Sequence, residues 1–555
     1  MKEMIRIYCK NVGKYEDFEK GISLLEVYKA MNIQLSRPLA GVRVDNISRA
    51  LTYTCYTPKD VEFIDIGDPS GMRSYVRSLC FVLSKAVNDL YPKGKIYIEH
   101  PVAKGYFCDL DTGSEITPEI VKNIKQRMLD IIRQDIPFAF YSGHTKEVVA
   151  LFRQNDMEDK ALLLETLGKV YSNYNKLGDH IDYYYGALLP STGWIHLFGL
   201  EKYGTGLLLR VPDPHHHNDL QPFVQQDKMM AVFGELLKYQ NAVQMSNVGD
   251  LNKANQQGEI SHLVKVSEAI QERKIARIAD EITERFKNGV RVVLISGPSS
   301  SGKTTFCKRL QVELRVNILR PISISLDDYY VNRVDTPLEE NGEYDYESLY
   351  AIDLHLFNSD LKKILAGEEV ALPTYDFVRG ERVYKGNTIQ LKEDSILVLE
   401  GIHALNPQLL PEIPPSVAYK IYVSALTTIS LDDHNWIPTT DNRLLRRIIR
   451  DYQFRNYSAK ETIARWPSVR RGEDKWIFPF QEEADAMFNS AMIYELAALK
   501  RSVEPILNQV SPIDPEYSEA YRLLKFLNYF NYIDIEELPN TSLLREFLGG
   551  SSFRY

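Results

Sequence analysis

The sequence predicts an α/β protein in which a C-terminal domain with a mostly parallel sheet follows two smaller α+β units. Three observations lead to this prediction. After residue 290, apolar β-branched runs such as "VRVVLIS" alternate with helical segments such as "TTFCKRLQVEL", the pattern of a parallel sheet covered by helices. Near the N-terminus, segments of alternating polarity flank one short helical segment. Between the two regions, long amphipathic segments surround the strand-like "KIYIEH".

The N-terminal half divides into two units. Residues 1–67 carry the strand-like "MIRIYCKNV" and "VRVDNISRALTYTCY" on either side of the helical "SLLEVYKAM", so we predict a small α+β domain. Residues 68–212 open with the helix "SGMRSYVRSLCFVLSKAVNDLY" and return to helix in "TPEIVKNIKQRMLDIIRQ", which predicts a second α+β domain. The polar stretch "VPDPHHHNDLQP" marks its end.

The remaining chain contains a linker and one large domain. We assign residues 213–289 to a linker that ends in the long amphipathic helix "SHLVKVSEAIQERKIARIADEITERFKNG". Residues 290–555 form the α/β domain, and the Leu and Phe spacing of "SEAYRLLKFLNYFNYIDIEELPNTSLLREFLGG" predicts a helical cap at its C-terminal end. A chain of 555 residues is long enough for each of these domains to bury its own core.

Charge and cysteine content favour small-molecule partners in a reducing compartment. A formal net charge of −9 and a pI near 5.8 argue against an extended nucleic-acid or membrane-binding face. The five cysteines are scattered without a C-x-x-C pair, so neither a disulfide framework nor a zinc ribbon is expected. No apolar run is long enough to span a bilayer. We therefore expect a cytoplasmic protein without a membrane partner, and the sequence leaves monomer and homo-oligomer open.

The stretch "GPSSSGKTT" predicts a nucleotide site. Its glycines, lysine and threonine fit G-x-x-x-x-G-K-[ST], in which a glycine-rich turn exposes backbone N–H groups to phosphates at the start of a helix. The preceding strand and the following helix supply the context that the motif requires. The chain is therefore expected to bind a nucleoside triphosphate, ATP or GTP, through Gly297, Pro298, Ser299, Ser300, Ser301, Gly302, Lys303, Thr304 and Thr305.

Three further segments carry residues suited to phosphoryl transfer. "PISISLDDYY" ends a strand with paired carboxylates, of which we choose Asp327 as the group that orients an alcohol and accepts its proton. Glu400 ends the strand "SILVLE" and is a candidate Mg²⁺ or water ligand, or a capping carboxylate. In "TTDNRLLRRIIRD", Arg443, Arg447 and Arg450 share one helical face. Such a face is either solvated or closes over the nucleotide to stabilise transition-state charge.

These motifs occur in the order of a known family. Through "GPSSSGKT", "SLDDYY", "LPTYDFVRGER", "LVLEGIHAL", "RLLRRIIRD" and "PFQEEADAMFN", residues 290–492 resemble the uridine kinases, P-loop kinases related to phosphoribulokinase. The resemblance implies that Lys303 contacts the phosphates, that Thr304 and Glu400 serve Mg²⁺, and that Asp327 is the base for a 5′-hydroxyl. It also implies a nucleoside pocket, with Asp345 at the ribose hydroxyls and Tyr375 and Arg382 in its wall. By the same resemblance Arg447, Arg450 and Arg455 lie near the phosphates and the sugar, with Arg447 binding the nucleotide, Arg450 catalytic and Arg455 binding the substrate.

The sequence departs from this family at the acceptor side. Tyr346 and Glu347 stand where uridine kinases usually have His-Pro, and Gly380 stands where a histidine contacts the pyrimidine. A histidine that bonds a base edge cannot become glycine without changing the donors of the pocket. The insertion "SALTTISLDDHNWIPTTDN" is also unlike a minimal uridine kinase. A ribonucleoside acceptor is expected, while uridine or cytidine, a purine nucleoside and another hydroxyl compound stay open.

The N-terminal half has a resemblance of its own. Residues 5–65 resemble a TGS domain, and "SYVRSLCFVLSKAVNDLYPKGKIYIEHPVAKGYFCDL" with "DYYYGALLPSTGWIHLF" resembles the second additional, editing domain of threonyl-tRNA synthetase. That domain normally uses H-x-x-x-H and C-x-x-x-H, but the matching positions hold Arg77, Phe81, Tyr184 and Leu188. These side chains do not form a metal-ligand set. We expect a scaffold that has lost the editing chemistry.

Two functions therefore compete. The first is an ATP- or GTP-dependent nucleoside kinase that phosphorylates the 5′-hydroxyl of a ribonucleoside, as in nucleoside salvage. The second is a regulatory P-loop NTPase whose synthetase-like half binds RNA. Asp327 together with Asp345 favours the kinase, because a switch protein needs no acceptor pocket.

Overall fold

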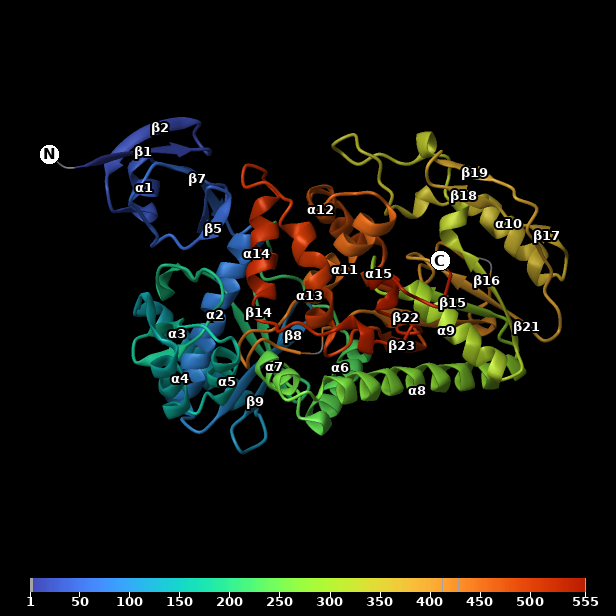
Figure 1. Cartoon of the computed structure of the whole chain (residues 1–555), viewed down its shortest axis with the longest axis horizontal. Coiled ribbons are helices and arrows are strands. Elements are labelled where there is room, and N and C mark those ends of the chain that lie inside the picture. The colour runs from blue at the N-terminus through green and yellow to red at the C-terminus, as the bar shows by residue number, and fades with distance from the viewer. Residues whose placement is uncertain (1–2, 412, 428, 555) are drawn as a thin grey trace.

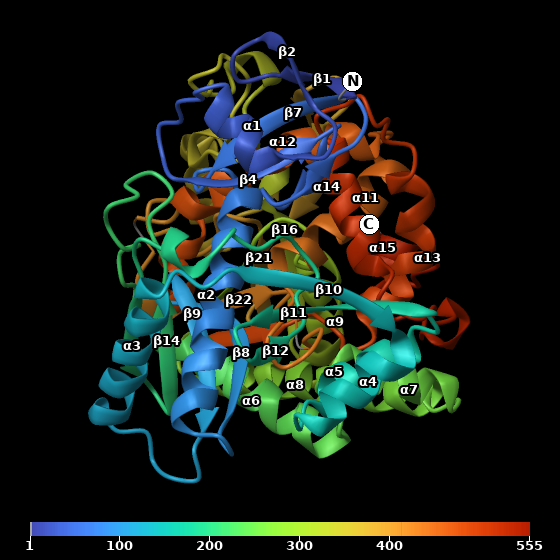
Figure 2. The ribbon, with the colours of Figure 1, turned by 90° about the vertical axis from the view of Figure 1, so that its left-hand side faces the viewer.

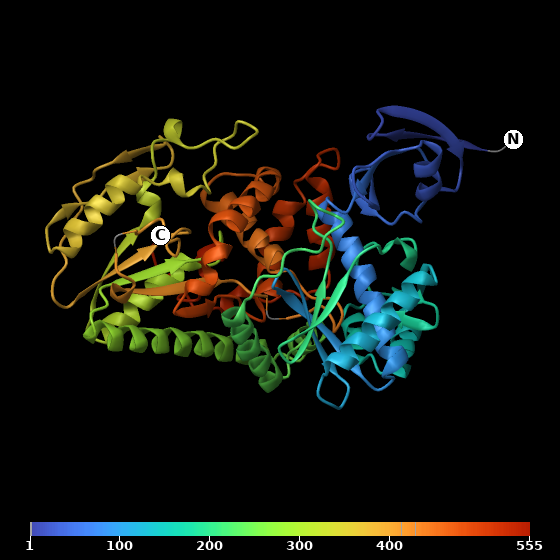
Figure 3. The same cartoon turned by 180° about the vertical axis from the view of Figure 1, so that it is seen from behind.

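The computed structural model describes residues 3–411, 413–427 and 429–554. The N-terminal half lies at one end of the molecule and the large parallel sheet at the other, with the C-terminal helices between them (Figure 1). The same arrangement is seen from behind in Figure 3. Within the described residues, no helix combines the length and the apolarity needed to cross a membrane.

The first unit is a sheet that covers one short helix. Its five-stranded sheet has the order β2-β1-β7-β4-β5, and helix α1 (Leu24–Ala30) begins with a capping box between Ser23 and Glu26. Buried Ile7, Val42 and Phe63 pack its core. The strands are β1 (Met4–Cys9), β2 (Lys14–Glu19), β3 (Ile22–Ser23), β4 (Leu39–Val44), β5 (Ile47–Arg49), β6 (Thr54–Cys55) and β7 (Lys59–Asp65).

The second unit packs around one long helix, α2 (Pro69–Leu90), which is buried along most of its length. A four-stranded sheet of order β13-β14-β9-β8 and a three-stranded sheet of order β10-β11-β12 surround it (Figure 2). The strands are β8 (Lys95–Val102), β9 (Gly105–Asp111), β10 (Phe138–His144), β11 (Tyr171–Leu177), β12 (His180–Asp182), β13 (Gly199–Tyr203) and β14 (Gly206–Arg210). The helices are α3 (Pro118–Arg133), α4 (Thr145–Gln154) and α5 (Glu158–Thr166).

The segment predicted as a linker contains three helices. The long helix expected from the sequence is α8 (Ile260–Lys287), whose apolar side packs under the parallel sheet. Two helices precede it, α6 (Asp227–Val243) and α7 (Val248–Gln256). The sequence signal for α6 is weak because few of its side chains are buried, and those that are, such as Met229 and Phe233, reach the core of the C-terminal domain. Tertiary packing therefore stabilises this segment more than its own pattern does.

The C-terminal domain is built on a five-stranded sheet of order β16-β21-β15-β22-β23. All of its strand pairs are parallel, which confirms the predicted fold class. The strands are β15 (Val292–Ser296), β16 (Arg320–Ser325), β21 (Ser395–Glu400), β22 (Ala418–Ser424) and β23 (Ala486–Asn489). Short hairpins lie beside the sheet, formed by β17 (Val370–Ala371), β18 (Thr374–Asp376), β19 (Glu381–Val383) and β20 (Thr388–Ile389). The helices are α9 (Lys303–Val316), α10 (Leu354–Leu365), α11 (Thr439–Phe454), α12 (Ala459–Trp476), α13 (Glu495–Leu507), α14 (Tyr517–Leu527) and α15 (Arg545–Leu548).

The two halves share one hydrophobic core. Phe152 and Leu164 of the N-terminal half and Leu444, Leu499 and Leu527 of the C-terminal helices belong to the same buried cluster. Burial of this apolar surface stabilises both halves at once.

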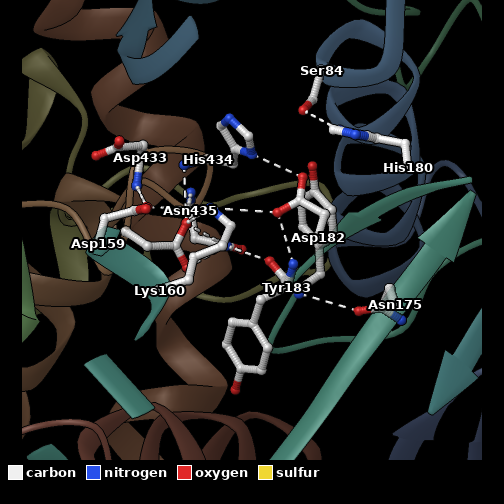
Figure 4. Close-up of polar contacts among 12 residues, drawn as sticks. Ser84, Asp159, Lys160, Asn175, His180, Asp182, Tyr183, Asp433, His434 and Asn435 are labelled. Carbon is white, nitrogen blue, oxygen red and sulfur yellow. Dashed lines mark hydrogen bonds and ion pairs between the residues drawn. The ribbon is translucent and has the colours of Figure 1, made fainter. Parts of the chain in front are cut away.

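The insertion before the arginine-rich helix docks on the N-terminal half through buried charges (Figure 4). Lys160 Nζ lies 3.0 Å from Asp432 Oδ1 and 3.4 Å from Asp182 Oδ1. His434 Nδ1 lies 2.8 Å from Asp182 Oδ2, and Asn435 donates to the carbonyl of Tyr183 at 2.7 Å. The insertion therefore joins the halves directly before α11 begins.

Candidate functional site

The phosphate loop lies between β15 and α9, as predicted. Ser300 and Gly302 have positive φ values of 58° and 81°. In a turn that contains left-handed residues such as these, backbone N–H groups point towards one place. A Cβ on Gly297 would overlap the carbonyl of Val423, so only glycine fits there. The hydroxyls of Ser300 and Ser301 are buried without a hydrogen-bond partner among the described residues. Buried polar atoms are normally paired, so this loop is fitted to a ligand with acceptor oxygens.

Helices α11 and α12 hold the loop in place. Ser299 donates its backbone N–H to Glu473 at 3.1 Å, and its carbonyl accepts from Arg443 at 3.1 Å. Arg447 donates to the Ser299 hydroxyl at 2.8 Å. Arg443 is buried in an ion pair with Glu473, so its role is structural. The face of α11 expected to be either solvated or functional therefore contacts the loop directly.

The C-terminal segment also reaches the loop. Glu546 of α15 accepts hydrogen bonds from the backbone N–H of Thr305 at 3.1 Å and from its hydroxyl at 2.6 Å. A Cβ on Gly302 would overlap the side chain of Leu543. The tail thus packs against the first turn of α9, where helix N–H groups favour negative charge.

Most predicted site residues line one cavity of about 1170 Å³ between the phosphate loop, the ends of β16 and β21, the β18–β19 hairpin and α11. The predicted residues in its wall are Ser299, Ser300, Ser301, Gly302, Lys303, Thr304, Asp327, Tyr375, Glu400, Arg447, Arg450 and Arg455. The predicted residues outside the lining are Gly297, Pro298, Thr305, Asp345 and Arg382. The cavity therefore joins the phosphate loop to the residues expected for the acceptor.

Carboxylates gather at one end of the cavity. Asp327 lies in a 3-10 turn, Leu326–Tyr329, directly after β16, and Glu400 ends β21 beside it in the parallel sheet. Burial raises the pKa of Glu400 to about 7, against the opposing charge of Lys303. Asp328 does not line the cavity, because its carboxylate accepts the backbone N–H of Tyr375 at 3.1 Å. Of the paired aspartates, Asp327 alone faces the cavity.

Arginines gather opposite these carboxylates. Asp451 is shared by Arg447 at 3.2 Å, Arg450 at 2.7 Å and Arg455 at 3.8 Å. Three guanidinium groups around one carboxylate leave excess positive charge at the wall of the cavity. Arg450 and desolvation together lower the pKa of Arg455. An anion such as a nucleotide phosphate would relieve this repulsion.

Aromatic rings also line the cavity. Tyr330, Tyr375 and Phe377 pack edge to face, with centroids 5.0 to 6.4 Å apart. Arg333 lies beside them in the wall and fills the space at Gly380, whose φ is 76°. An aromatic surface with an arginine suits a flat, polar group such as a base.

Two residues expected in the acceptor pocket have other contacts. Arg382 forms an ion pair with Asp353 at 2.8 Å. Asp345 accepts the backbone N–H of Glu347 at 3.1 Å and so holds the turn before Ser348. Neither side chain is in the wall of the cavity, and their contacts with a substrate remain predictions.

Glu347 lines the cavity without having been predicted as a site residue. Its Oε2 is buried without a hydrogen-bond partner among the described residues. Burial raises its pKa to about 7, with Arg447 acting in the opposite direction. The sequence did mark this position, because Tyr346 and Glu347 replace the His-Pro that uridine kinases usually have there. Arg333, Glu473 and Glu546 were also missed, because each reaches the site from a distant segment.

The four positions that align with the editing motif are occupied by packed or stacked side chains. Phe81, Tyr184 and Leu188 pack in one core cluster, and the rings of Phe81 and Tyr184 have centroids 5.2 Å apart. Arg77 is 8% exposed and stacks on Tyr185 at 4.7 Å. No group of three or more His, Cys, Asp or Glu residues suited to a metal occurs in the part of the chain that the structure describes.

Comparisons with known proteins find relatives of two kinds. Residues 292–497 match the model of the Phosphoribulokinase / Uridine kinase family. The threonine--tRNA ligase of Clostridium kluyveri is 29% identical over 192 residues, which are 34% of this chain and 30% of the ligase. That of Desulforamulus reducens is 31% identical over 192 residues, again 34% and 30%. This chain thus matches less than a third of the length of these relatives.

Among solved structures, one described as a "Possible Uridine Kinase from Bacillus stearothermophilus" matches with 20% identity and a TM-score of 0.25, covering 38% of this chain and all of that one. The family match over residues 292–497, together with the phosphate loop between β15 and α9, indicates a P-loop domain of the type found in kinases. That domain is similar to the Phosphoribulokinase / Uridine kinase family, and the N-terminal region is similar to threonyl-tRNA synthetases.

Proposed function

We propose that the chain is a nucleoside kinase that transfers the γ-phosphate of ATP or GTP to the 5′-hydroxyl of a ribonucleoside. The observation that carries the proposal is a single cavity whose wall contains Lys303, Asp327 and Glu400 and continues to the aromatic cluster of Tyr375. A phosphoryl-transfer enzyme needs a phosphate cradle, a carboxylate for the acceptor and an acceptor pocket in one space. We assign this chemistry to residues 290–555 and a scaffold role to residues 1–67 and 68–212.

The phosphates bind at the start of α9. Backbone N–H groups of the loop and the free hydroxyls of Ser300 and Ser301 donate to phosphate oxygens. Lys303, whose Nζ now lies 3.2 Å from the carbonyl of Pro298, turns to the phosphates. Arg447 and Arg450 stabilise the charge that spreads over the transferred group.

The donor set at the cavity also fits Mg²⁺. Glu400 supplies a buried carboxylate and Thr304 a hydroxyl in the same wall, and oxygen ligands of this kind suit Mg²⁺. The pKa of Glu400, raised to about 7 by burial, means that a cation would favour its ionised form. When bound, Mg²⁺ would neutralise charge on the phosphate oxygens.

Asp327 serves as the base. The 5′-hydroxyl oxygen forms a bond to the γ-phosphorus while the bond to the leaving diphosphate breaks, and the hydroxyl proton passes to the Asp327 carboxylate. Helix α11 and the tail hold the loop through the contacts of Arg447 with Ser299 and of Glu546 with Thr305. The products are a nucleoside monophosphate and a nucleoside diphosphate.

We infer the class of acceptor from the aromatic part of the cavity wall. Tyr330, Tyr375 and Phe377 offer apolar faces and edges to a base. With Gly380 in place of a histidine and Arg333 filling its space, we expect weaker discrimination for pyrimidines over purines than in a typical uridine kinase. Loss of one polar contact to a base is worth about 1–3 kcal/mol.

The test is a product assay on the full chain. The protein is incubated with Mg-ATP or Mg-GTP and separately with uridine, cytidine, adenosine, guanosine and a sugar alcohol, and monophosphates are measured by mass spectrometry. Formation of a 5′-monophosphate supports the proposal. If nucleotide is hydrolysed and no acceptor is phosphorylated, while RNA stimulates the hydrolysis, the regulatory NTPase is supported instead.

A further inference from the structure

A group of four cations lies where both N-terminal units meet the C-terminal helices. They come from separate elements: Arg49 from β5, Arg77 from α2, Lys169 from the turn before β11 and Lys525 from α14. In the described residues, none of the four side chains forms an ion pair, and none donates a side-chain hydrogen bond. Clustered cations without carboxylates repel one another, so such a group is costly unless an anion binds there.

Arg77 is the buried member of the group. It is 8% exposed, and its guanidinium lies 4.7 Å from the Tyr185 ring centroid and against Gly186, where a Cβ would overlap it. A buried guanidinium normally binds a carboxylate, a carbonyl or a phosphate, because its five donors are costly to leave unpaired. The contact with an aromatic face offsets only part of this cost.

The other cations surround the same spot. The ring of Tyr185 lies 6.1 Å from that of Tyr529, and Lys169 Nζ lies 5.5 Å from the Tyr529 centroid. Arg77 and Lys169 therefore each contact one of two neighbouring rings, those of Tyr185 and Tyr529. Desolvation and the charges of Arg77, Arg49 and Lys169 lower the pKa of Lys525 to about 8, so Lys525 lies within electrostatic reach of the other three cations.

The elements that carry these cations are fixed relative to one another. The hydroxyls of Ser48 on β5 and Ser518 on α14 lie 3.2 Å apart. Arg73 of α2 forms an ion pair with Glu519 of α14 at 3.1 Å. These neighbouring charges are satisfied, which sets the four unpaired cations apart from ordinary interdomain ion pairs. A preorganised group of donors on rigid elements is what an anion site requires.

We propose that this group, which we name the junction cations (Arg49, Arg77, Lys169 and Lys525), binds a small compound that carries a di- or triphosphate group. Several charges gathered at one point suit a compact, multiply charged anion. A long nucleic-acid backbone would need an extended basic stripe, and the chain as a whole has a net charge of −9. The site is separate from the phosphate loop, so it does not depend on the kinase proposal.

The test uses isothermal titration calorimetry of inorganic tripolyphosphate into the full chain. Lys303→Ala removes the lysine of the phosphate loop, and this variant should still bind tripolyphosphate. Adding Arg77→Gln and Lys525→Gln should weaken that binding at least tenfold. The matched control is Lys122→Gln on exposed α3, which should leave it unchanged.

Further arms keep the outcome decisive. Arg77→Lys preserves the charge and should therefore bind tripolyphosphate more tightly than Arg77→Gln does. This comparison separates loss of a ligand contact from loss of folding, and circular dichroism measures the folding of each variant. The proposal is overturned if the Lys303→Ala chain does not bind tripolyphosphate, or if binding is the same in the junction and control variants. It is also overturned if a single-stranded RNA, but not tripolyphosphate, is the ligand lost in the junction variants.

Discussion

Glu546, in the short helix α15, accepts hydrogen bonds from both the backbone N–H and the hydroxyl of Thr305 in the first turn of the phosphate-loop helix. A carboxylate thus lies at helix donors of the type that bind phosphate in P-loop proteins. Its charge also adjoins Glu400, whose pKa it helps to raise. The tail therefore places a negative charge at the site where the phosphates of a nucleotide would bind.

We expect Glu546→Gln to tighten nucleotide binding. Removing the charge reduces its repulsion of the triphosphate and weakens the contact with Thr305. Together these effects should strengthen nucleotide binding by about 1–2 kcal/mol, which is a decrease of roughly 5–30-fold in Kd. Calorimetry with a non-hydrolysable nucleotide measures the change, and Glu537→Gln, on an exposed nearby turn, is the control. Weaker binding by Glu546→Gln would show that Glu546 supports the loop rather than competing with the ligand.

Lys303→Ala and Asp327→Asn should separate binding from chemistry. Lys303 supplies charge to the phosphates, so its loss weakens nucleotide binding and transfer together. Asparagine keeps the shape of Asp327 without its basicity, so nucleotide binding should persist while turnover falls by about 10²–10⁴-fold. Both quantities are measured with the acceptor that gives product. Wild-type turnover by Asp327→Asn would remove this residue from the role of base.

Arg333→Gln should affect the acceptor more than the nucleotide. Arg333 lies in the cavity wall beside the aromatic cluster and occupies the space at Gly380. Loss of a charged contact of about 1.5 kcal/mol would raise the acceptor KM roughly tenfold, with the nucleotide KM unchanged. Arg379→Gln, whose side chain is 70% exposed, is the control. Equal losses in both KM values would mean that Arg333 supports the whole cavity.

His434→Gln should destabilise the junction between the halves, and more so in acid than in base. Burial opposes the charge of His434, but Asp182 raises its pKa above the ordinary 6.5. The stabilisation is therefore complete below pH 6.5 and is lost as the pH rises through the raised value. The loss should be about 3 kcal/mol at pH 6, because Asp182 loses a buried partner.

Urea unfolding at pH 6 and pH 9 measures this difference, with exposed His262→Gln as the control. The comparison at pH 6 stays above the range in which Asp182, whose pKa is lowered by His434 and Lys160 against the effect of burial, becomes protonated. An effect of His434→Gln that is equal at both pH values would contradict a charged His434.

Local patterns predicted the centre of the kinase domain well. The phosphate loop, β15, β16, β21 and α11 all follow from apolar periodicity and from short motifs, because each is determined by residues close in sequence. The choice of Asp327 and Glu400 followed from their places at the ends of parallel strands, where both face the cavity.

The residues that the sequence did not reveal depend on distant contacts. Glu546 meets Thr305 across 241 positions of the chain, and no local period records such a contact. Helix α6 carries few buried residues and is held by another domain's core. The sequence showed the insertion only as a segment unlike a minimal uridine kinase, yet its Asp432 and His434 pair with Lys160 and Asp182. In each case tertiary structure, rather than propensity, determines the outcome.

The shared core of the two halves has a consequence during synthesis. The core residues of the N-terminal half, Val148, Phe152 and Tyr183, leave the ribosome long before the C-terminal helices that pack on them. Leu444 is one of the first buried residues of those helices to be made, and Leu527 is one of the last. At about 5–20 residues per second, the roughly 260 residues between Tyr183 and Leu444 take on the order of 15–50 s to translate. For that time an apolar face of the nascent N-terminal half stays partly uncovered, so the yield of folded protein depends on how quickly the ribosome delivers the C-terminal helices.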